Sequence, residues 1–135
     1  TQCRIQIDGS SVPNPGPMSL GAVRRLPDGT QHSLSKALHQ SGCNNEAELL
    51  ALMAALTLAH ELGARCLTIR TDSHVLLEQL GPPMAKPARP IARLNHLFED
   101  ARQQMQGFDE LVLQWIPRHR NTEADALARA AHTQA

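Results

Sequence analysis

Two short runs of β-forming residues each lead directly into an aspartate, and this pattern constrains the fold more than any other feature of the chain. Residues 3–7 alternate in hydrophobicity before Asp8, and the apolar run 66–71 precedes Asp72. If the two strands are central neighbours in a sheet, both acids lie at the same edge. Our hypothesis is that Asp8 is a metal ligand at a strand end. The alternative is that Asp8 only caps the turn before Gly9 through the local backbone.

The remaining patterns predict an α/β fold with the element order βββαβααβα. We expect further strands over residues 20–26, 30–38 and 111–116, and helices over residues 46–62, 73–80, 91–106 and 122–132. A turn signal at residues 27–29 predicts that the first three strands form an antiparallel meander. Strand–helix–strand crossovers favour parallel pairing for the later strands. Residues 1–135 should therefore form a single domain, a five-stranded mixed sheet with helices on both faces.

The long helix and one connector have clear boundary signals. Asn44 or Asn45 is the expected N-cap of the helix over residues 46–62, and Gly63 is the expected stop. Residues 81–90 include four prolines, which predict an irregular connector.

Composition limits the functions that the chain can have. Lys and Arg number 13, Asp and Glu also number 13, and the formal net charge is zero, so any nucleic-acid binding must depend on local patches. Two Phe, one Trp and no Tyr nearly exclude aromatic platforms for base stacking. Three cysteines without a CxxC pair indicate neither a zinc ribbon nor a disulfide framework, and we expect Cys3 and Cys66 to be buried thiols. No membrane span or signal peptide is visible, so we expect a cytoplasmic monomer.

Two further acids, Glu48 and Asp125, lie near predicted helix starts. Each has a structural alternative as the acidic residue of a capping box, Glu48 after Asn45 and Asp125 after Thr122. Carboxylates that lie close together repel unless they share a proton or a cation. Mg²⁺ takes one or two carboxylates together with substrate phosphates. A divalent-metal site is therefore expected if these acids join the two aspartates that follow strands.

The histidines show no metal-binding spacing, since HxH, HxxxH and HExxH are all absent. His119 lies in the loop 117–121, where a histidine near a metal site could move protons. The alternative is an ordinary exposed loop histidine. His74 follows Asp72 closely and is expected to face the same rim.

Together these residues resemble the ribonuclease H type 1 family over nearly the whole chain. Residues 8–22 resemble its D-G-S-x(3)-N-P-G-P-x(3)-G-A signature, and residues 44–49 resemble N-N-x-x-E-L. Residues 71–73 match T-D-S, and residues 121–128 resemble N-x-x-A-D-x-L-A. Each motif alone is weak, but four motifs in order with consistent separations are specific.

The resemblance implies a metal-dependent endoribonuclease. It would hydrolyse the RNA strand of an RNA–DNA hybrid with two Mg²⁺ or Mn²⁺ ions, leaving a 5′-phosphate and a 3′-hydroxyl. The family's four acids would be Asp8, Glu48, Asp72 and Asp125. The residues implied to contact the hybrid, partly by reading the RNA 2′-hydroxyl, are Gly9, Ser10, Asn14, Asn44 and Asn45.

The chain departs from the better-known bacterial pattern in its grip on the substrate. That pattern has a basic, Trp-containing protrusion between the middle helices, where this chain has only Lys86 and Arg89 as charges within residues 81–90 and no aromatic residue. We therefore expect weaker and more salt-sensitive binding of the hybrid, because Lys and Arg contacts to phosphates dominate affinity.

The loop before Asp125 is also shorter than in that pattern. Counted from Trp115, His119 matches the histidine that assists product release in the family. Relatives with a short loop often have Pro-Arg here, so Arg118 is the alternative candidate.

Two alternatives remain open from the sequence. The chain could be a non-catalytic nucleic-acid-binding module on the same scaffold, because one fold hosts many functions. Four retained acids argue against that reading, since a pure binder has no need of clustered like charges. Double-stranded RNA is a further candidate substrate.

Overall fold

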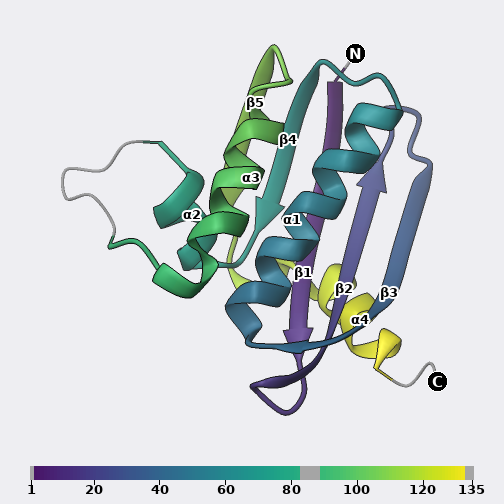
Figure 1. The fold of residues 1–135 in the computed structure, drawn as a ribbon. Coiled ribbons are helices and arrows are strands. Elements are labelled where there is room, and N and C mark those ends of the chain that lie inside the picture. The colour runs from purple at the N-terminus through teal and green to yellow at the C-terminus, as the bar shows by residue number, and fades with distance from the viewer. Residues whose placement is uncertain (1, 83–88, 133–135) are drawn as a thin grey trace.

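A five-stranded mixed sheet with the strand order β3-β2-β1-β4-β5 forms the centre of the fold (Figure 1). The computed structural model describes residues 2–82 and 89–132. The strands are β1 (Gln2–Ser11), β2 (Gly16–Arg25), β3 (Gln31–Gly42), β4 (Cys66–Thr71) and β5 (Glu110–Trp115). The first three pair antiparallel, whereas β4 pairs parallel with β1 and β5 parallel with β4. The predicted fold class and meander are therefore confirmed.

Helices cover both faces of this sheet, as predicted. The helices are α1 (Asn44–Glu61), α2 (His74–Leu80), α3 (Asn95–Met105) and α4 (Thr122–Ala131). Figure 1 shows α1 and α3 on one face and α4 on the other. A 3₁₀ turn at Ala92–Leu94 replaces the first turn of the helix predicted over residues 91–106, and another at Arg118–Arg120 precedes α4. Within the described residues, no helix is long and apolar enough to cross a membrane.

The main core lies between β1 and α1. Ile5 and Ile7 are 1% and 0% exposed, so the alternation seen in the sequence does place both on one buried face. They belong to the same buried cluster as Leu49, Leu52 and Leu56 of α1. Full burial of each such side chain contributes about 1.5–3 kcal/mol, which makes this layer a strong support for the elements that it joins.

The ends of α1 confirm one prediction and overturn another. Gly63 ends the helix with φ of 74°, a left-handed conformation that glycine adopts without strain. The N-cap, however, is Cys43, whose Sγ accepts a hydrogen bond from the Glu46 N–H at 3.4 Å. The prediction of Asn44 or Asn45 as the N-cap is wrong because both residues already lie in the first helical turn.

The first strand is longer than predicted, and this changes the place of Asp8. Parallel pairing between β1 and β4 reaches only Gln6 and Arg70. The strand nevertheless continues to Ser11, because β2 still pairs with it and Gly21 lies opposite Asp8. Asp8 therefore lies inside β1, at the point where the neighbouring β4 ends. The prediction that Asp8 ends its own strand, or caps a turn there, is wrong.

Two glycines allow the helices to approach the sheet closely. A Cβ atom at Gly9 would lie 2.2 Å from the carbonyl carbon of Ala47 in α1. A Cβ atom at Gly21 would lie 2.3 Å from the carbonyl oxygen of Ala124 in α4. Both approaches involve backbone atoms, which cannot swing aside as side chains can. The residue after each of these alanines is one of the four candidate acids.

The cysteines and the connector after α2 give smaller results. Cys3 is buried as predicted, but Cys66 is only half-buried at the start of β4. Residues 81–82 and 89–90 lie outside helices and strands, in agreement with an irregular connector. Residues 83–88, including Lys86, lie outside the described part of the chain.

Candidate metal centre

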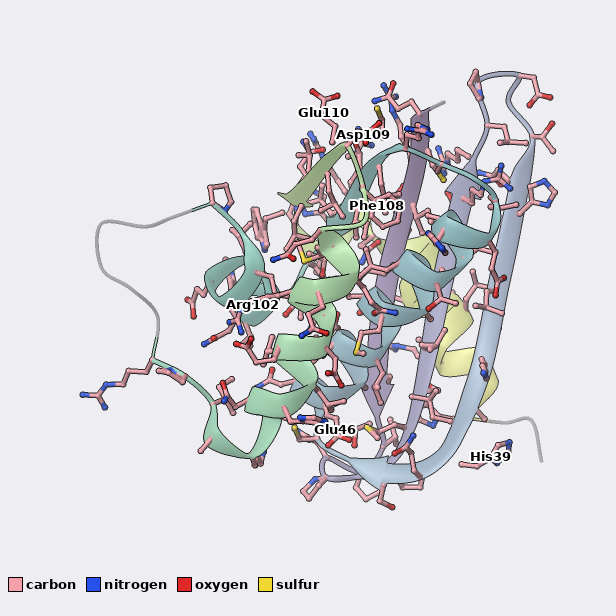
Figure 2. The ribbon with its side chains drawn as sticks, turned by 45° about the horizontal axis from the view of Figure 1, so that its top comes forward. His39, Glu46, Arg102, Phe108, Asp109 and Glu110 are labelled. Carbon is pink, nitrogen blue, oxygen red and sulfur yellow. The ribbon has the colours of Figure 1, made fainter. Side chains whose placement is uncertain are left out.

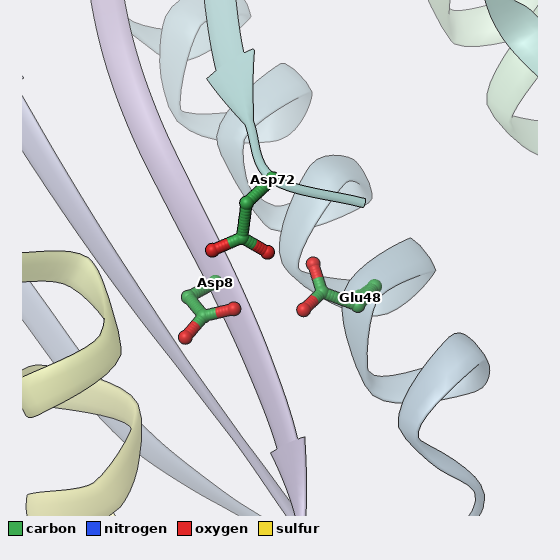
Figure 3. Close-up of side chains that lie close together, drawn as sticks. All are labelled: Asp8, Glu48 and Asp72. Atoms are coloured by element: carbon green, nitrogen blue, oxygen red, sulfur yellow. The ribbon is translucent and has the colours of Figure 1, made fainter. Parts of the chain in front are cut away.

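Three carboxylates from three different elements converge at the end of β4. Asp8 extends from β1, Glu48 from α1, and Asp72 from the residue directly after β4 (Figure 3). One carboxylate oxygen from each lies within 4.8 Å of the others. The prediction that the two aspartates after β-runs meet at one place in the sheet is therefore confirmed, because β1 and β4 are neighbours.

The early end of β4 explains how acids on opposite faces of the sheet can meet. Asp8 lies opposite Gly21, whose missing side chain would point at α4, so Asp8 belongs to the α4 face. Glu48 comes from α1, which packs on the other face. The pairing of β4 with β1 stops at Arg70, and β4 ends at Thr71. The two carboxylates meet across the flank of β1 that is left open there.

The electrostatics of this cluster are unfavourable without a cation or a shared proton. The pKa of Asp8 is raised from 3.8 to about 7, mainly by burial; a hydrogen bond with Glu48 lowers it, and the neighbouring Asp125 and Asp72 carboxylates contribute to the rise. Burial, followed by the nearby Asp8 carboxyl, holds the pKa of Glu48 well above its usual value. Asp8 is 5% exposed and Glu48 is 9% exposed, so solvent screens their repulsion poorly.

A hard divalent cation fits these residues. The donor atoms are all carboxylate oxygens, which Mg²⁺ and Mn²⁺ accept readily. Glu48 Oε2 is buried and has no hydrogen-bond partner among the described residues. A buried, unpartnered carboxylate oxygen costs free energy that a bound cation would recover.

The fourth candidate acid, Asp125, lies on the wall of the same cavity. Its Oδ2 forms an ion pair with Arg129 Nε at 3.1 Å, one turn along α4. The helix has Asn121 as its N-cap and no capping bond from that side chain, so the capping-box alternative for Asp125 is wrong. The same alternative fails for Glu48, because α1 already begins at Asn44.

The cavity at this centre has a volume of about 490 Å³. Its lining distinguishes the two basic residues that the sequence left as alternative candidates. Arg118 lines the cavity, whereas His119 is exposed and does not line it. His74 also lines it, as predicted, and stacks on Trp115 with the ring centroids 4.9 Å apart. Trp115 Nε1 in turn donates a hydrogen bond to the backbone carbonyl of Asp72 at 3.2 Å. This rim therefore contains one stacked pair of rings, made by a tryptophan and a histidine.

Comparison with known proteins agrees with this geometry. The family model described as reverse transcriptase-like matches residues 6–131. The chain belongs to the ribonuclease H type 1 family. It is 34% identical over 124 residues to ribonuclease HI of Halobacterium salinarum, covering 92% of this chain and 61% of that protein. It is also 37% identical over 128 residues to a bifunctional protein of Mycobacterium tuberculosis, covering 94% of this chain but 34% of the relative.

Solved structures of the ribonuclease H type 1 family extend this likeness. The crystal structure of RNase H1 from Halobacterium salinarum has a TM-score of 0.87 at 31% identity, with both chains covered completely. LC11-RNase H1, solved in complex with an RNA/DNA hybrid, has a TM-score of 0.79 at 28% identity over 96% of this chain and 95% of that one. The chain spans about a third of the length of the mycobacterial proteins that it matches.

In this member of the ribonuclease H type 1 family, the asparagine motifs join the loop after β1 to α1. Asn44 Oδ1 accepts from the Ser11 N–H at 2.9 Å, and Asn14 Oδ1 accepts from the Asn44 N–H at 3.0 Å. Of the residues expected to contact a hybrid, four line the cavity: Gly9, Ser10, Asn44 and Asn45. Asn14 is exposed next to them and does not line it.

Sequence reasoning missed the support given by Asn121. This side chain is completely buried, and its Nδ2 donates to the Ile7 carbonyl at 2.8 Å and to Asp72 Oδ2 at 3.2 Å. It therefore connects β1, the end of β4 and the start of α4 at the acid cluster. Its position in the closing motif was the only signal in the sequence.

Proposed function

We propose that this chain is a metal-dependent endoribonuclease that hydrolyses the RNA strand of RNA–DNA hybrids. The observation that carries the proposal is the convergence of Asp8, Glu48 and Asp72 at one buried point of a ribonuclease H fold. Two of these acids have strongly raised pKa values, which is typical of a site built for a cation. The solved complex of LC11-RNase H1 with an RNA/DNA hybrid supports the choice of substrate.

The metal site would use the four acids of the cavity wall. The residues that would hold two Mg²⁺ or Mn²⁺ ions are Asp8, Glu48, Asp72 and Asp125. When bound, such ions supply an activated water and stabilise the leaving 3′ oxygen, which leads to 5′-phosphate and 3′-hydroxyl products.

The chain's own residues position this centre and the substrate. The Asn121 amide orients the Asp72 carboxylate, and Arg129 orients Asp125. Arg118 is our candidate for a cation that contacts a substrate phosphate at the cavity, with His119 as the weaker alternative because it lies outside the lining. Polar groups beside the acids would contact the RNA 2′-hydroxyl, which separates RNA from DNA. These groups belong to Ser10, Asn14, Asn44 and Asn45.

The experiment compares Asp72→Asn with a matched control, Asp109→Asn. Asp109 is exposed at the opposite end of the sheet, so its variant removes the same charge away from the cavity. We expect Asp72→Asn to lose cleavage of the hybrid with Mg²⁺ by about a thousandfold or more while it keeps its fold, and we expect the control to cut normally. Hybrid, RNA–RNA and DNA–DNA duplexes tested side by side establish which substrates are cut.

Full cleavage by a folded Asp72→Asn protein would refute the assignment. Calorimetry with Mg²⁺ distinguishes the enzyme from a non-catalytic binding module. Heat of binding that disappears in Asp72→Asn supports the enzyme, and a wild-type protein without any carboxylate-dependent binding supports the module.

A further inference from the structure

One side of β4 and β5 is largely open: among the described residues, α2 contacts β5, and its Leu77 borders this side. On that side of the sheet, α4 packs against β1, β2 and β3. Buried residues of β4 and β5, such as Ile69 and Leu113, face α1 and α3 instead. The alternate residues in register across the three strands therefore form an open sheet face. These are Arg4, Thr68 and Val112 in one row and Gln6, Arg70 and Gln114 in the next.

Two arginines lie beside Gln6 on this open sheet face. Arg4 lies two residues earlier on the same side of β1, and Arg70 is the register partner of Gln6 on β4. The Gln6 side chain is itself held in place, because its Nε2 donates to the backbone carbonyl of Arg120 at 3.2 Å. Arg70 Nε donates to Gln114 Oε1 at 3.1 Å, and neither Arg4 nor Arg70 has an ion pair with an acid in the part of the chain that the structure describes. Two guanidinium groups without acidic partners on one face give it a positive potential that attracts anions.

The arginines line a continuous hollow that leads toward the metal centre. Two adjoining hollows of about 690 and 400 Å³ share Gln2, Arg4 and Arg70 in their walls. The larger one extends to Trp115, whose indole bonds to the backbone of Asp72.

The acids of this region lie at its margins. Arg25, the register partner of Arg4, is already paired with Glu123. Glu110 lies at the far end of β5, and Figure 2 shows it with Asp109 at the opposite end of the molecule from Glu46. The centre of the open sheet face therefore keeps a net positive charge although the whole chain is neutral.

We propose that this arginine face, defined by Arg4 and Arg70, binds the phosphate backbone of a nucleic-acid strand that continues past the acid cavity. The inference rests on the proposed function, since it extends the substrate from that site. Repeated negative charge is the chemistry that uncompensated arginines select, and their fork of donors matches phosphate oxygens. Continuity with the metal centre through Trp115 and Asp72 favours the nucleic acid over an acidic protein. The face would also replace part of the grip that a basic protrusion gives.

The test measures binding separately from cleavage. Anisotropy of a labelled hybrid of about 20 base pairs is recorded in EDTA between about 50 and 200 mM NaCl. Replacing Arg4→Gln and Arg70→Gln together should weaken binding about tenfold at the lower salt and reduce the slope of log K against log [NaCl] by about two. The matched control combines Lys36→Gln with Arg65→Gln, which removes two exposed charges away from the face. The control should bind within about twofold of the wild type.

Each outcome decides the matter. A wild-type slope in the Arg4/Arg70 double variant overturns the arginine face, and so does an equal loss in the control, because the effect would then be general charge. Arg4→Lys with Arg70→Lys should keep most of the slope. If the glutamine pair does not fold, Arg4→Gln alone, at an exposed side chain, should reduce the slope by about one.

Cleavage separates this inference from the proposed function. Arginine-dependent binding without any cleavage would leave the arginine face standing and refute the nuclease. Cleavage together with binding that does not depend on the arginines would refute the arginine face and leave the nuclease standing.

Discussion

Replacing Asp8 by Asn should stabilise the metal-free protein at alkaline pH. The pKa of Asp8 rises from 3.8 to about 7 in the folded protein, mainly because the carboxyl is buried. Each pKa unit corresponds to about 1.36 kcal/mol, so ionising Asp8 costs about 4 kcal/mol more in the folded protein than in the unfolded chain. Asn has nearly the same size and no charge. We expect the Asp8→Asn protein to gain about 2–4 kcal/mol in free energy of unfolding at about pH 8 in EDTA, the lower end allowing for the buried amide.

The gain should depend on pH with a defined sign. The folded protein binds the Asp8 proton more tightly than the unfolded chain does, so wild-type stability falls as pH rises from 3.8 to about 7. The advantage of the Asn variant is therefore largest above that range, falls by more than half at about pH 5, and disappears at still lower pH. Urea denaturation followed by circular dichroism at each pH measures the free energy directly.

Bound metal should offset most of this difference in stability. Mg²⁺ at 100 times its dissociation constant would stabilise the wild type by about 2.7 kcal/mol, and the variant would lose most of this effect. The exposed Asp109→Asn variant is the control and should stay within about 0.5 kcal/mol of the wild type. An Asp8→Asn protein that is less stable than the wild type at about pH 8 in EDTA would refute the strained carboxylate cluster.

Two further predictions test the support and the rim of the cluster. Gly21→Ala should destabilise the protein by about 3 kcal/mol or more in urea denaturation, because its new Cβ would meet backbone atoms of α4, whereas Gly107→Ala, whose Cβ would meet only one carbonyl oxygen at 3.3 Å, should cost much less. If both variants cost the same, close approach of α4 is not the reason for Gly21. Arg118→Ala should reduce hybrid cleavage about tenfold or more and His119→Ala less than about twofold, and the opposite order in single-turnover kinetics would exclude Arg118.

Local patterns predicted the elements of this fold well, because they depend on near neighbours in the chain. Alternation around Ile5 and Ile7 indicated β1, and Gly63 indicated the end of α1. Ser73, at the start of the helix predicted over residues 73–80, caps α2 with its Oγ, which accepts from the Leu76 N–H at 3.2 Å. Each of these signals acts within four residues. The order of elements then allowed few ways to build the sheet.

The site needed information that no local pattern contains. Asp8 was predicted at the end of its own strand because the local alternation stops there. In the structure it is β4 that ends at this level, since β1 continues beside β2, and the length of a strand depends on its partner. The role of Gly21 appears only when α4 lies against β2, about a hundred residues later in the chain. The stack of His74 on Trp115 joins residues from α2 and β5 in the same way.

The unequal lengths of β1 and β4 connect the fold to the chemistry. If β4 continued beside β1 for two more residues, its backbone would occupy the flank through which Glu48 reaches Asp8. The sheet therefore gives up strand pairing beside this part of β1. Buried carboxylates with raised pKa values occupy the gap instead. Both features cost stability in the free protein. A cation that binds there recovers the electrostatic part, so replacing Asp8 or Glu48 should weaken metal binding while it removes this cost from the metal-free protein.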